Sequence, residues 1–378
     1  MAQSIELLLV IYLLFLSGCS SGTPSIPETE NETLNKLLES VPFTQVSLHD
    51  VSIDTLFAEE ENVLPVKRAS SLSPSARLGQ VLGLIKVGDS LYVADGQQDC
   101  IWIINDQGIL HRKIGRKGRG PGEFGDLNGI VKNSNHIFTS DISNGRIQIF
   151  DFNFNLQGLF NYIIGGDILT GNKSFTVTDS LLYLSTGVNS TTDKLVTAYK
   201  VTPPFDSLTS FHPSLIPPGM QPAAYNNYFI DTNVQGNIAI SYLGLPYIFL
   251  YDNRQKLRHV VYVEFPEDEI PDNPSPEPVS IPARRESEAI GVRGLMGHLS
   301  IAEDKSLYFF GRRELYHILF DADAKEYKPH RAIFFTFGDP EKRKAQPHGI
   351  ATTSITIEDD TIYLGSIFEE RIYRFPLN

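Results

Sequence analysis

The sequence contains few of the residues and motifs that mark redox, metal or hydrolytic chemistry. Only 2 of its 378 residues are cysteines, and they lie too far apart for a C-x-x-C pair. Neither H-E-x-x-H, which arranges two histidines and a glutamate around zinc, nor the G-x-S-x-G turn of serine hydrolases occurs. We therefore assign no catalytic residue from the sequence, and any cofactor or bound metal stays undetermined.

Positive charge is also scarce. The chain has 32 Lys and Arg residues against 45 Asp and Glu, a formal net charge of -13 at pH 7. Such a surface repels the phosphate backbone of nucleic acids, which proteins bind with clustered Lys and Arg. It also disfavours loose electrostatic adhesion to anionic lipid. We expect no nucleic-acid partner.

Long hydrophobic runs are confined to one stretch near the N-terminus. Residues Leu7–Leu16 are apolar throughout, but about ten residues are too few for a helix that spans a bilayer of about 30 Å. Their length suits the hydrophobic core of a signal peptide. The run ends in Leu16-Ser17-Gly18-Cys19, which resembles the lipobox of bacterial lipoproteins, where small side chains admit the peptidase and the thiol is lipidated.

The lipobox divides the N-terminal region into two expected parts. Residues 1–18 are a lipoprotein signal peptide, and residues 19–42 are a flexible polar tether. Lipidated Cys19 would bind the protein to the membrane, so we expect it in the cell envelope, at the outer membrane. An ordinary or uncleaved signal peptide is the alternative. The second cysteine, Cys100, lies in an apolar strand-like run and is expected to be a small buried hydrophobe.

The chain is rich in strand-forming and turn-forming residues, and they repeat. Phe (23) and Tyr (16) are plentiful, and Gly (29) and Pro (23) recur between apolar runs. The clearest unit begins at Gly83 and reads as strand, Gly-Asp turn, strand, loop, strand, turn, strand. A four-stranded meander of this kind is the blade of a β-propeller.

One residue in the second strand of each unit marks the repeat. The marks recur about every 45 residues at first and at wider intervals later, where insertions are needed. We predict an all-β fold, a six-bladed β-propeller of four-stranded antiparallel blades over residues 43–378, with an acidic, Pro-rich inserted loop region at 265–295. A β-sandwich pair or a β-helix is the alternative. The marks are Tyr92, Phe138, Tyr183, Ala239, Tyr308 and Tyr363.

The last unit ends one strand short, shortly after its third strand at Arg371–Phe375. Before the first unit, Phe43–Leu48 and Val63–Lys67 resemble additional strands. Because a propeller avoids an open edge, we expect part of residues 43–80 to complete the sixth blade.

The second unit carries a family resemblance. Asp141 ends one strand, Asn144 and Arg146 follow in the hairpin, and an apolar strand leaves, which resembles the core of an NHL repeat. The linker Gly115–Phe124 resembles the glycine-rich connection between blades of the same group. With the lipobox, the chain is similar to six-bladed β-propeller lipoproteins with NHL-type repeats, most of unassigned function. An Asp at a strand end can accept turn N–H groups and pair with Arg, so we expect structural roles for Asp95, Asp141 and Arg146.

Ligands of ring-shaped folds sit at a mouth of the central channel, where the inner strands begin. The resemblance implies that some relatives hold a metal there with histidines from several blades. A metal site needs at least about three good ligands, and two of the candidates here are histidines. The candidate ligand-binding residues at the channel mouth are Asn128, Lys173, Tyr228, Arg293, His298 and His348.

The glycine-rich linker also holds the most basic spot of an acidic protein. Its Arg116, Lys117 and Arg119 form a candidate anion-binding loop. It is not a nucleotide-binding loop, because G-K-[ST] and a following helix are absent. The sequence suggests no role for His111, His136, His212, His259, His317 and His330.

The leading functional hypothesis is an exported, lipid-anchored binding or scaffolding module for a peptide, glycan or protein partner. One alternative is a lyase or hydrolase at the channel mouth around His298 and His348, with or without a metal. The other is the sensor component of a surface signalling system. Fold alone does not choose among them.

Overall fold

Strands of this protein carry apolar residues on both faces. In the computed structural model, β5 (Ser90–Asp95) turns Leu91 and Val93 toward one neighbouring sheet and Tyr92 and Ala94 toward the other. Successive side chains of a strand point to opposite faces, so a run without polar alternation is covered on both sides. Sheets with this pattern must pack face to face with a neighbour on each side, as the blades of a ring do.

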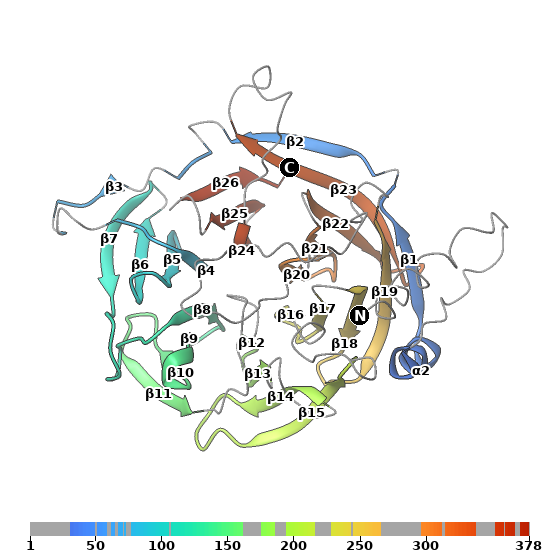
Figure 1. Ribbon diagram of the computed structural model, residues 1–378, viewed down its shortest axis with the longest axis horizontal. Coiled ribbons are helices and arrows are strands. Elements are labelled where there is room, and N and C mark those ends of the chain that lie inside the picture. The colour runs from blue at the N-terminus through green and yellow to red at the C-terminus, as the bar shows by residue number, and fades with distance from the viewer. Residues whose placement is uncertain are drawn as a thin grey trace, which may run out of the picture.

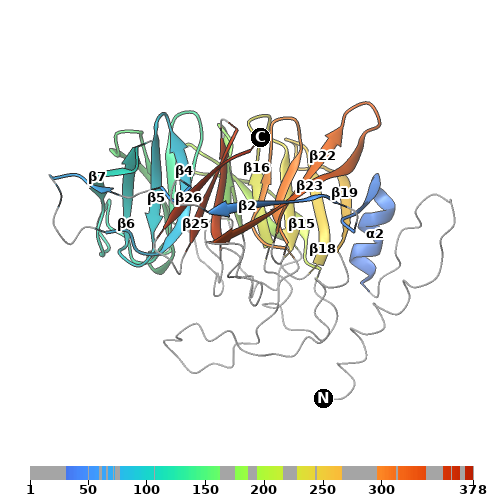
Figure 2. The same cartoon turned by 90° about the horizontal axis from the view of Figure 1, so that it is seen from above.

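The structure describes residues 31–377 except 50, 59–61, 65–66, 71, 73–76, 106, 162–174, 186–193, 216–227, 243–244, 266–295, 312–313, 338–351, 359 and 367–370. Within these ranges the strands form six sheets around a central axis (Figure 1). Seen from the side, the ring is a disc whose strands run roughly along its axis (Figure 2). The predicted all-β, six-bladed propeller is confirmed.

Each blade uses consecutive strands, from the centre outward, in antiparallel order. Blade 1 contains β4 (Val81–Val87), β5, β6 (Cys100–Asn105) and β7 (Ile109–Ile114). Blade 2 contains β8 (Leu127–Lys132), β9 (Ile137–Asp141), the 3-10 turn η1 (Ile142–Asn144), β10 (Arg146–Phe150) and β11 (Leu156–Asn161). Blade 3 contains β12 (Phe175–Val177), β13 (Leu181–Ser185), β14 (Lys194–Lys200) and β15 (Ser207–Pro213).

The second half of the ring repeats this order. Blade 4 contains β16 (Tyr228–Thr232), β17 (Ile238–Tyr242), β18 (Leu245–Tyr251) and β19 (Leu257–Glu264). Blade 5 contains β20 (Leu299–Ile301), β21 (Leu307–Phe310), β22 (Glu314–Asp321) and β23 (Glu326–Phe337). Blade 6 contains β24 (Thr352–Glu358), β25 (Thr361–Ser366) and β26 (Ile372–Pro376). All six predicted marks, from Tyr92 to Tyr363, fall on the second strand of their blade.

The hydrophobic core is divided among the junctions between blades. Each of the six junctions holds one cluster of buried side chains contributed by the two facing sheets. The inner strands of neighbouring blades touch one another around the whole ring. The ring is therefore closed by packing between blade 6 and blade 1, where Tyr363 and Ile372 join Trp102 and Val93.

The N-terminal part of the described chain begins with a helix, α2 (Glu32–Ser40). Asn31 caps it by accepting a 3.0 Å hydrogen bond from the backbone N–H of Leu34. Leu34 and Leu38, one helical turn apart, are buried against blades 3 and 4. The sequence assigned residues 19–42 to a flexible tether, and for residues 31–42 this is wrong, because the apolar face of α2 is part of a blade junction.

The described residues between 31 and 69, which we call the strap, lie along the outside of the ring (Figure 1). β1 (Phe43–Ser47) adds to β19 of blade 4, and β2 (Ile53–Ala58) adds to β23 of blade 5, both in parallel. Val63 forms an isolated antiparallel bridge to Tyr373 of β26, so the N-terminal part of the chain reaches the outer edge of the sixth blade as expected, but the described sheet keeps three strands. Finally β3 (Lys67–Arg68) pairs in parallel with β7 of blade 1.

Candidate functional site

The predicted mouth residues fall into two groups. Asn128, Tyr228 and His298 lie where inner strands of blades 2, 4 and 5 begin, on what we call the upstream face. The remaining residues of the predicted set lie outside the described residues. They are Lys173, Arg293 and His348. Cys19, the predicted lipidation site, also lies outside the described residues.

Asn128 occupies a β-bulge at the start of β8. The pairing of β8 with β9 shifts between Leu127 and Gly129, so Asn128 is the extra residue. A bulge re-aims the side chain of that residue and is common beside functional sites. The side-chain carbonyl oxygen of Asn128 is buried, and no described residue donates a hydrogen bond to it. A buried acceptor of this kind is unusual in a native protein and is suited to accept a donor from a ligand.

The bulge recurs on the inner strands on one side of blade 2. The register of β4 shifts between Val81 and Gly83, and that of β24 shifts between Thr352 and Ser354. Blades 6, 1 and 2 therefore share the same irregularity at their upstream ends. Of the three extra residues, Leu82, Asn128 and Thr353, the sequence had singled out Asn128 for ligand binding.

His298 lies directly before β20 and faces the junction of blades 4 and 5. His298 is 8% exposed. The imidazole tilts against the ring of Phe229, with the ring centroids 5.2 Å apart. Its carbonyl accepts a hydrogen bond from Phe310 N–H, which keeps the backbone in the blade. His298 is therefore an upstream-face residue whose ring packs at the junction of blades 4 and 5.

Tyr228 has a structural role at the junction of blades 3 and 4. Its hydroxyl donates a 2.7 Å hydrogen bond to the carbonyl of Leu195 in blade 3. Burial raises the pKa of this hydroxyl above its usual range. Since the hydroxyl is occupied within the protein and the residue is buried, Tyr228 supports the ring rather than offering a group to a ligand.

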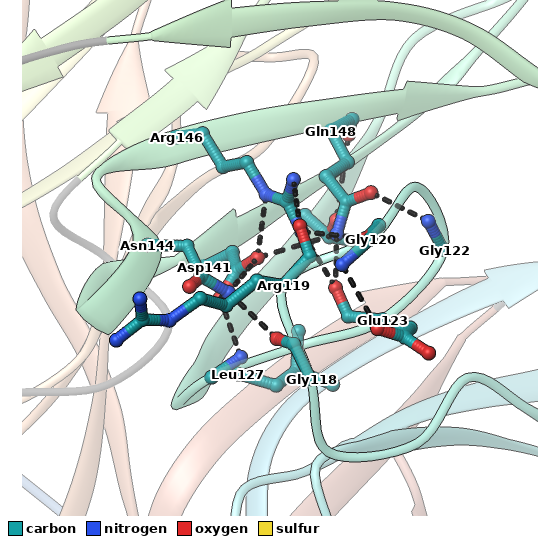
Figure 3. Close-up of polar contacts among 12 residues, drawn as sticks. Gly118, Arg119, Gly120, Gly122, Glu123, Leu127, Asp141, Asn144, Arg146 and Gln148 are labelled. Carbon is teal, nitrogen blue, oxygen red and sulfur yellow. Dashed lines mark hydrogen bonds and ion pairs between the residues drawn. The ribbon is translucent and has the colours of Figure 1, made fainter.

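The NHL-like residues of blade 2 form one connected hydrogen-bond network (Figure 3). Asp141 is completely buried at the end of β9, and its Oδ1 accepts a 2.7 Å hydrogen bond from Gly125 N–H in the linker ahead of the blade. Its Oδ2 accepts a 2.7 Å bond from Arg146 Nε. Asn144 Nδ2 donates to both oxygens at 2.9 Å. Asp141 thus ties the end of the second strand to the start of its own blade.

Arg146 connects this hydrogen-bond network to the glycine-rich linker. Its guanidinium donates to the carbonyls of Arg119, Gly120 and Glu123 at 2.8 to 2.9 Å (Figure 3). A guanidinium is suited to this because its five donors are held in a rigid plane. Gln148 adds a 2.7 Å bond to the same Glu123 carbonyl. The linker is therefore held by its backbone, by residues of the blade that follows it.

The three basic residues of the linker differ in their contacts. Arg116 forms an ion pair with Glu123, at 2.8 Å between Nη2 and Oε1. A hydrogen bond from Gly120 N–H, followed by Arg116, lowers the pKa of Glu123. Lys117 and Arg119 are exposed, and the Arg119 side chain points away from the network (Figure 3). The predicted anion-binding loop thus has Lys117 and Arg119 on the surface and Arg116 already paired with a carboxylate.

Blade 1 has an equivalent carboxylate, Asp95, also completely buried. It accepts hydrogen bonds from Gly79 N–H at 2.7 Å and from Trp102 Nε1 at 2.9 Å. The N–H groups of Gln80, Gln97 and Gln98 complete the shell at 3.1 to 3.2 Å. The structural roles expected for Asp95, Asp141 and Arg146 are confirmed.

Comparison with known proteins agrees with this geometry. Residues 74–275 match the DUF5128 family, described as a 6-bladed beta-propeller, and this span is more than half of the 378-residue chain. The chain belongs to this family. No curated protein matches it in sequence.

Three solved structures are similar to this DUF5128 propeller. A Bacteroides fragilis protein named for its expected export has 14% identity and a TM-score of 0.49, with 85% of this chain and 88% of that chain covered. A DUF4221 family member from Bacteroides vulgatus has 11% identity and a TM-score of 0.47, with 79% and 92% covered. Virginiamycin B lyase from Staphylococcus aureus has 12% identity and a TM-score of 0.44, with 78% and 80% covered. Likeness at this level supports no argument about activity.

Polar side chains link the blades at the downstream mouth of the DUF5128 propeller, the mouth opposite the upstream face. Lys132 Nζ lies 2.9 Å from Glu358 Oε1 and also donates to the carbonyl of Lys86, so blades 2 and 6 are linked across blade 1. The side chains of this pair are 31% and 35% exposed. Sequence reasoning did not select Lys132 or Glu358. The available signal was their shared position, a few residues before Phe138 and Tyr363.

Three histidines without a predicted role are buried in the propeller. His212 Nδ1 and Nε2 each lie 2.7 Å from a tyrosine hydroxyl, those of Tyr251 and Tyr242. Burial lowers the pKa of His212 to about 3. His259 Nε2 lies 2.7 Å from the hydroxyl of Thr44 in the strap, and His317 stacks on Tyr308 with centroids 4.1 Å apart. Burial lowers the pKa of each of these two to about 4.

Two further groups bear on possible chemistry. Cys100 is buried as expected, and burial, then the nearby Asp95, raises the pKa of its thiol to about 12. Among the described residues, no three side chains of His, Cys, Asp or Glu gather in a way that could hold a metal ion. The described helices include none long and apolar enough to cross a membrane.

Proposed function

We propose that the protein is an exported, lipid-anchored binding or scaffolding module. It holds a peptide, glycan or protein partner at the upstream mouth of the propeller, while lipidated Cys19 ties it to the outer membrane. The observation that carries the ligand-binding part is the buried side-chain oxygen of Asn128, which receives no hydrogen bond from the described residues.

Energetics and position both support this use of Asn128. A buried polar group left without a partner costs about 1–3 kcal/mol, and a donor from a bound molecule recovers that cost on binding. Peptide N–H groups and glycan hydroxyls are both donors of this type. The bulge that carries Asn128 lies at the upstream end of β8, whose blade is held by the Asp141 and Arg146 network. The acceptor is therefore presented on a rigid support.

The anchor part of the proposal depends on the lipobox at Leu16–Cys19. The chain between Cys19 and Asn31, the cap of α2, can span at most about 40 Å. Because α2 packs at the junction of blades 3 and 4, this length sets how far that side of the ring can stand from the membrane. Palmitate labelling of wild type and Cys19→Ser tests it: label and membrane association should both be lost in the variant.

The binding part is tested with glycan arrays and a random peptide library screened on wild type, Asn128→Ala and Asn135→Ala. Asn135 is the matched control, because it is an exposed asparagine in the hairpin at the other end of the same strand. A ligand that donates to Asn128 should bind Asn128→Ala about tenfold more weakly, the equivalent of about 1.4 kcal/mol. Undiminished binding to Asn128→Ala, or specific turnover of a bound compound, would contradict the proposal.

A further inference from the structure

The outer edges of the blades are not equally covered. The strap adds a parallel strand to the outermost strands of blades 1, 4 and 5, and it bridges the outermost strand of blade 6. In the described part of the chain, blades 2 and 3 end at β11 and β15, with no further strand outside them (Figure 1). We call β11 (Leu156–Asn161) and Ser207–Ser210 of β15 the open edges.

The open edges lack the charged side chains that protect most exposed sheet edges. Each has a β-bulge, at Gln157 and at Leu208, but the covered strands β7, β19 and β23 have one too, so a bulge does not prevent strand addition here. Natural proteins guard such edges with charged side chains, Lys above all. The covered strands do carry charge, such as Lys113 in β7 and Arg258 in β19. The open edges are LQGLFN and SLTS, which contain no Lys, Arg, Asp or Glu. The uncharged edges of this ring are therefore the ones left open, the reverse of what protection requires.

Exposed apolar side chains lie on both open edges. Leu156 in β11 is 36% exposed and Leu208 in β15 is 51% exposed, and they are among the few large hydrophobic residues exposed in the described chain. The two edges also meet. Phe205, just before β15, lies against Gly158 of β11 and packs on Phe160 with ring centroids 5.6 Å apart. The open edges thus lie on two adjacent blades that touch, and each exposes one leucine among uncharged polar residues.

We propose that the open edges bind an extended segment of a partner protein, which adds as a parallel strand to β11 and β15. The molecule itself shows the mode, because β1, β2 and β3 each add in parallel to an outermost strand. The surface is also continuous with the strap: Phe211 of β15 shares a hydrophobic cluster with Leu34 and Leu38 of α2. With a partner segment bound there, all six blades have chain paired along their outer edge.

The direction of pairing selects a partner segment over a second copy of the chain. Two identical edges related by a two-fold axis present the same surface to each other, and such edge pairing within one continuous sheet runs antiparallel. The three strands that this ring accepts beside a fourth strand all run parallel to it. The antiparallel bridge of Val63 is made to β26, a third strand, which runs in the opposite direction. Strand addition draws its affinity from backbone hydrogen bonds and its specificity from alternate side chains. The segment should accordingly be uncharged and carry apolar residues at every second position.

The test pans a phage-displayed library of random 12-residue peptides on wild type, Leu208→Lys, Val234→Lys and Asn128→Ala. Val234 is the matched control, since it is an 86% exposed hydrophobic residue in a hairpin away from the open edges. Peptides that use the edges should lose at least about tenfold in affinity on Leu208→Lys and keep it on the other two variants. Bound peptide should slow amide hydrogen exchange in Leu156–Asn161 and Ser207–Ser210. Unchanged unfolding midpoints show that the variants fold.

Several results would overturn this inference. Peptides that bind Leu208→Lys as well as wild type, or a library that yields no binder, would do so. A wild-type dimer that Leu208→Lys dissociates would assign the edges to a second copy. Binding lost on Asn128→Ala but kept on Leu208→Lys would support the mouth site of the proposed function while removing the edge site, so the two proposals fail separately.

Discussion

The two halves of the ring bury different ionisable groups at their junctions. In blades 1 and 2 the buried acids are Asp95, Asp99 and Asp141. In blades 3 to 5 the buried ionisable groups include several histidines, among them His212 and His317, together with the acid Glu314. The same fold is therefore stabilised by charged acceptors on one side and by neutral imidazoles on the other.

The difference follows from what each group must hold. Asp141 collects donors from a loop, a turn and a guanidinium, and a carboxylate has about four acceptor positions for them. His212 lies between two tyrosine hydroxyls, where a neutral imidazole can offer one donor and one acceptor. A carboxylate organises loop ends, whereas an imidazole joins two side chains inside a packed junction.

The largest expected effect is loss of stability in acid, arising in blades 3 to 5. Burial lowers the pKa of His212 to about 3 and those of His259 and His317 to about 4, below the unfolded value of about 6.5. The unfolded chain then binds protons that the folded chain does not. Stability is full above about pH 6.5 and falls as the pH drops toward 4, by up to about 4 kcal/mol per pH unit for three such groups. Urea unfolding at pH 7, 6 and 5 measures this.

Two histidine variants sharpen the acid prediction. His212→Gln keeps a side chain that can donate and accept, and it should reduce the pH slope by about one third. His111 is exposed on β7, so His111→Gln should leave the slope unchanged. Equal slopes in His212→Gln and wild type would show that the acid sensitivity does not come from the blade 3 and 4 junction.

The second-largest effect is expected from removing Asp141, a buried carboxylate of blade 2. Asp141→Ala leaves the guanidinium of Arg146, whose side chain is 9% exposed, without its counter-charge. Removing one partner of a buried pair costs about 3–5 kcal/mol. The double variant Asp141→Ala/Arg146→Met should recover part of this loss, because no buried charge remains. Urea midpoints compare the three proteins, and a double variant no more stable than Asp141→Ala would contradict the ion-pair explanation.

The carboxylate half of the ring could be predicted from sequence, and the histidine half could not. Asp141, Asn144 and Arg146 act within one hairpin, so their spacing in the chain reflects their contacts. The partners of His212 lie about 30 and 39 residues away, on another blade. No local pattern records such a contact. The repeat gave the ring and the second-strand marks for the same reason, because each blade is built from consecutive strands.

The strap and the open edges show a second limit of sequence reasoning. β1 was recognisable as a strand, but its partner β19 follows more than 200 residues later and pairs in parallel. A strand added at an outer edge is only partly covered, so the alternation of buried and exposed residues along it is weak. In β2, Ile53, Asp54 and Thr55 are all exposed. Asn128 was selected from its distance to Phe138, and both residues belong to the same blade, where Asn128 is the bulge residue of β8.

The smallest expected effect concerns Trp102 of blade 1, which donates to Oδ2 of Asp95 as Arg146 of blade 2 donates to Oδ2 of Asp141. Trp102→Phe removes the 2.9 Å bond to Asp95, but four backbone N–H groups still satisfy this carboxylate, the nearest from Gly79 at 2.7 Å. No charge is left unpaired, so we expect a loss of only about 1–2 kcal/mol, from one hydrogen bond and a small cavity. The chain has a single tryptophan, Trp102, so Trp102→Phe removes the tryptophan fluorescence signal. Circular dichroism must therefore follow unfolding. A loss as large as that of Asp141→Ala would mean that the indole, and not the loop backbone, holds Asp95 in place.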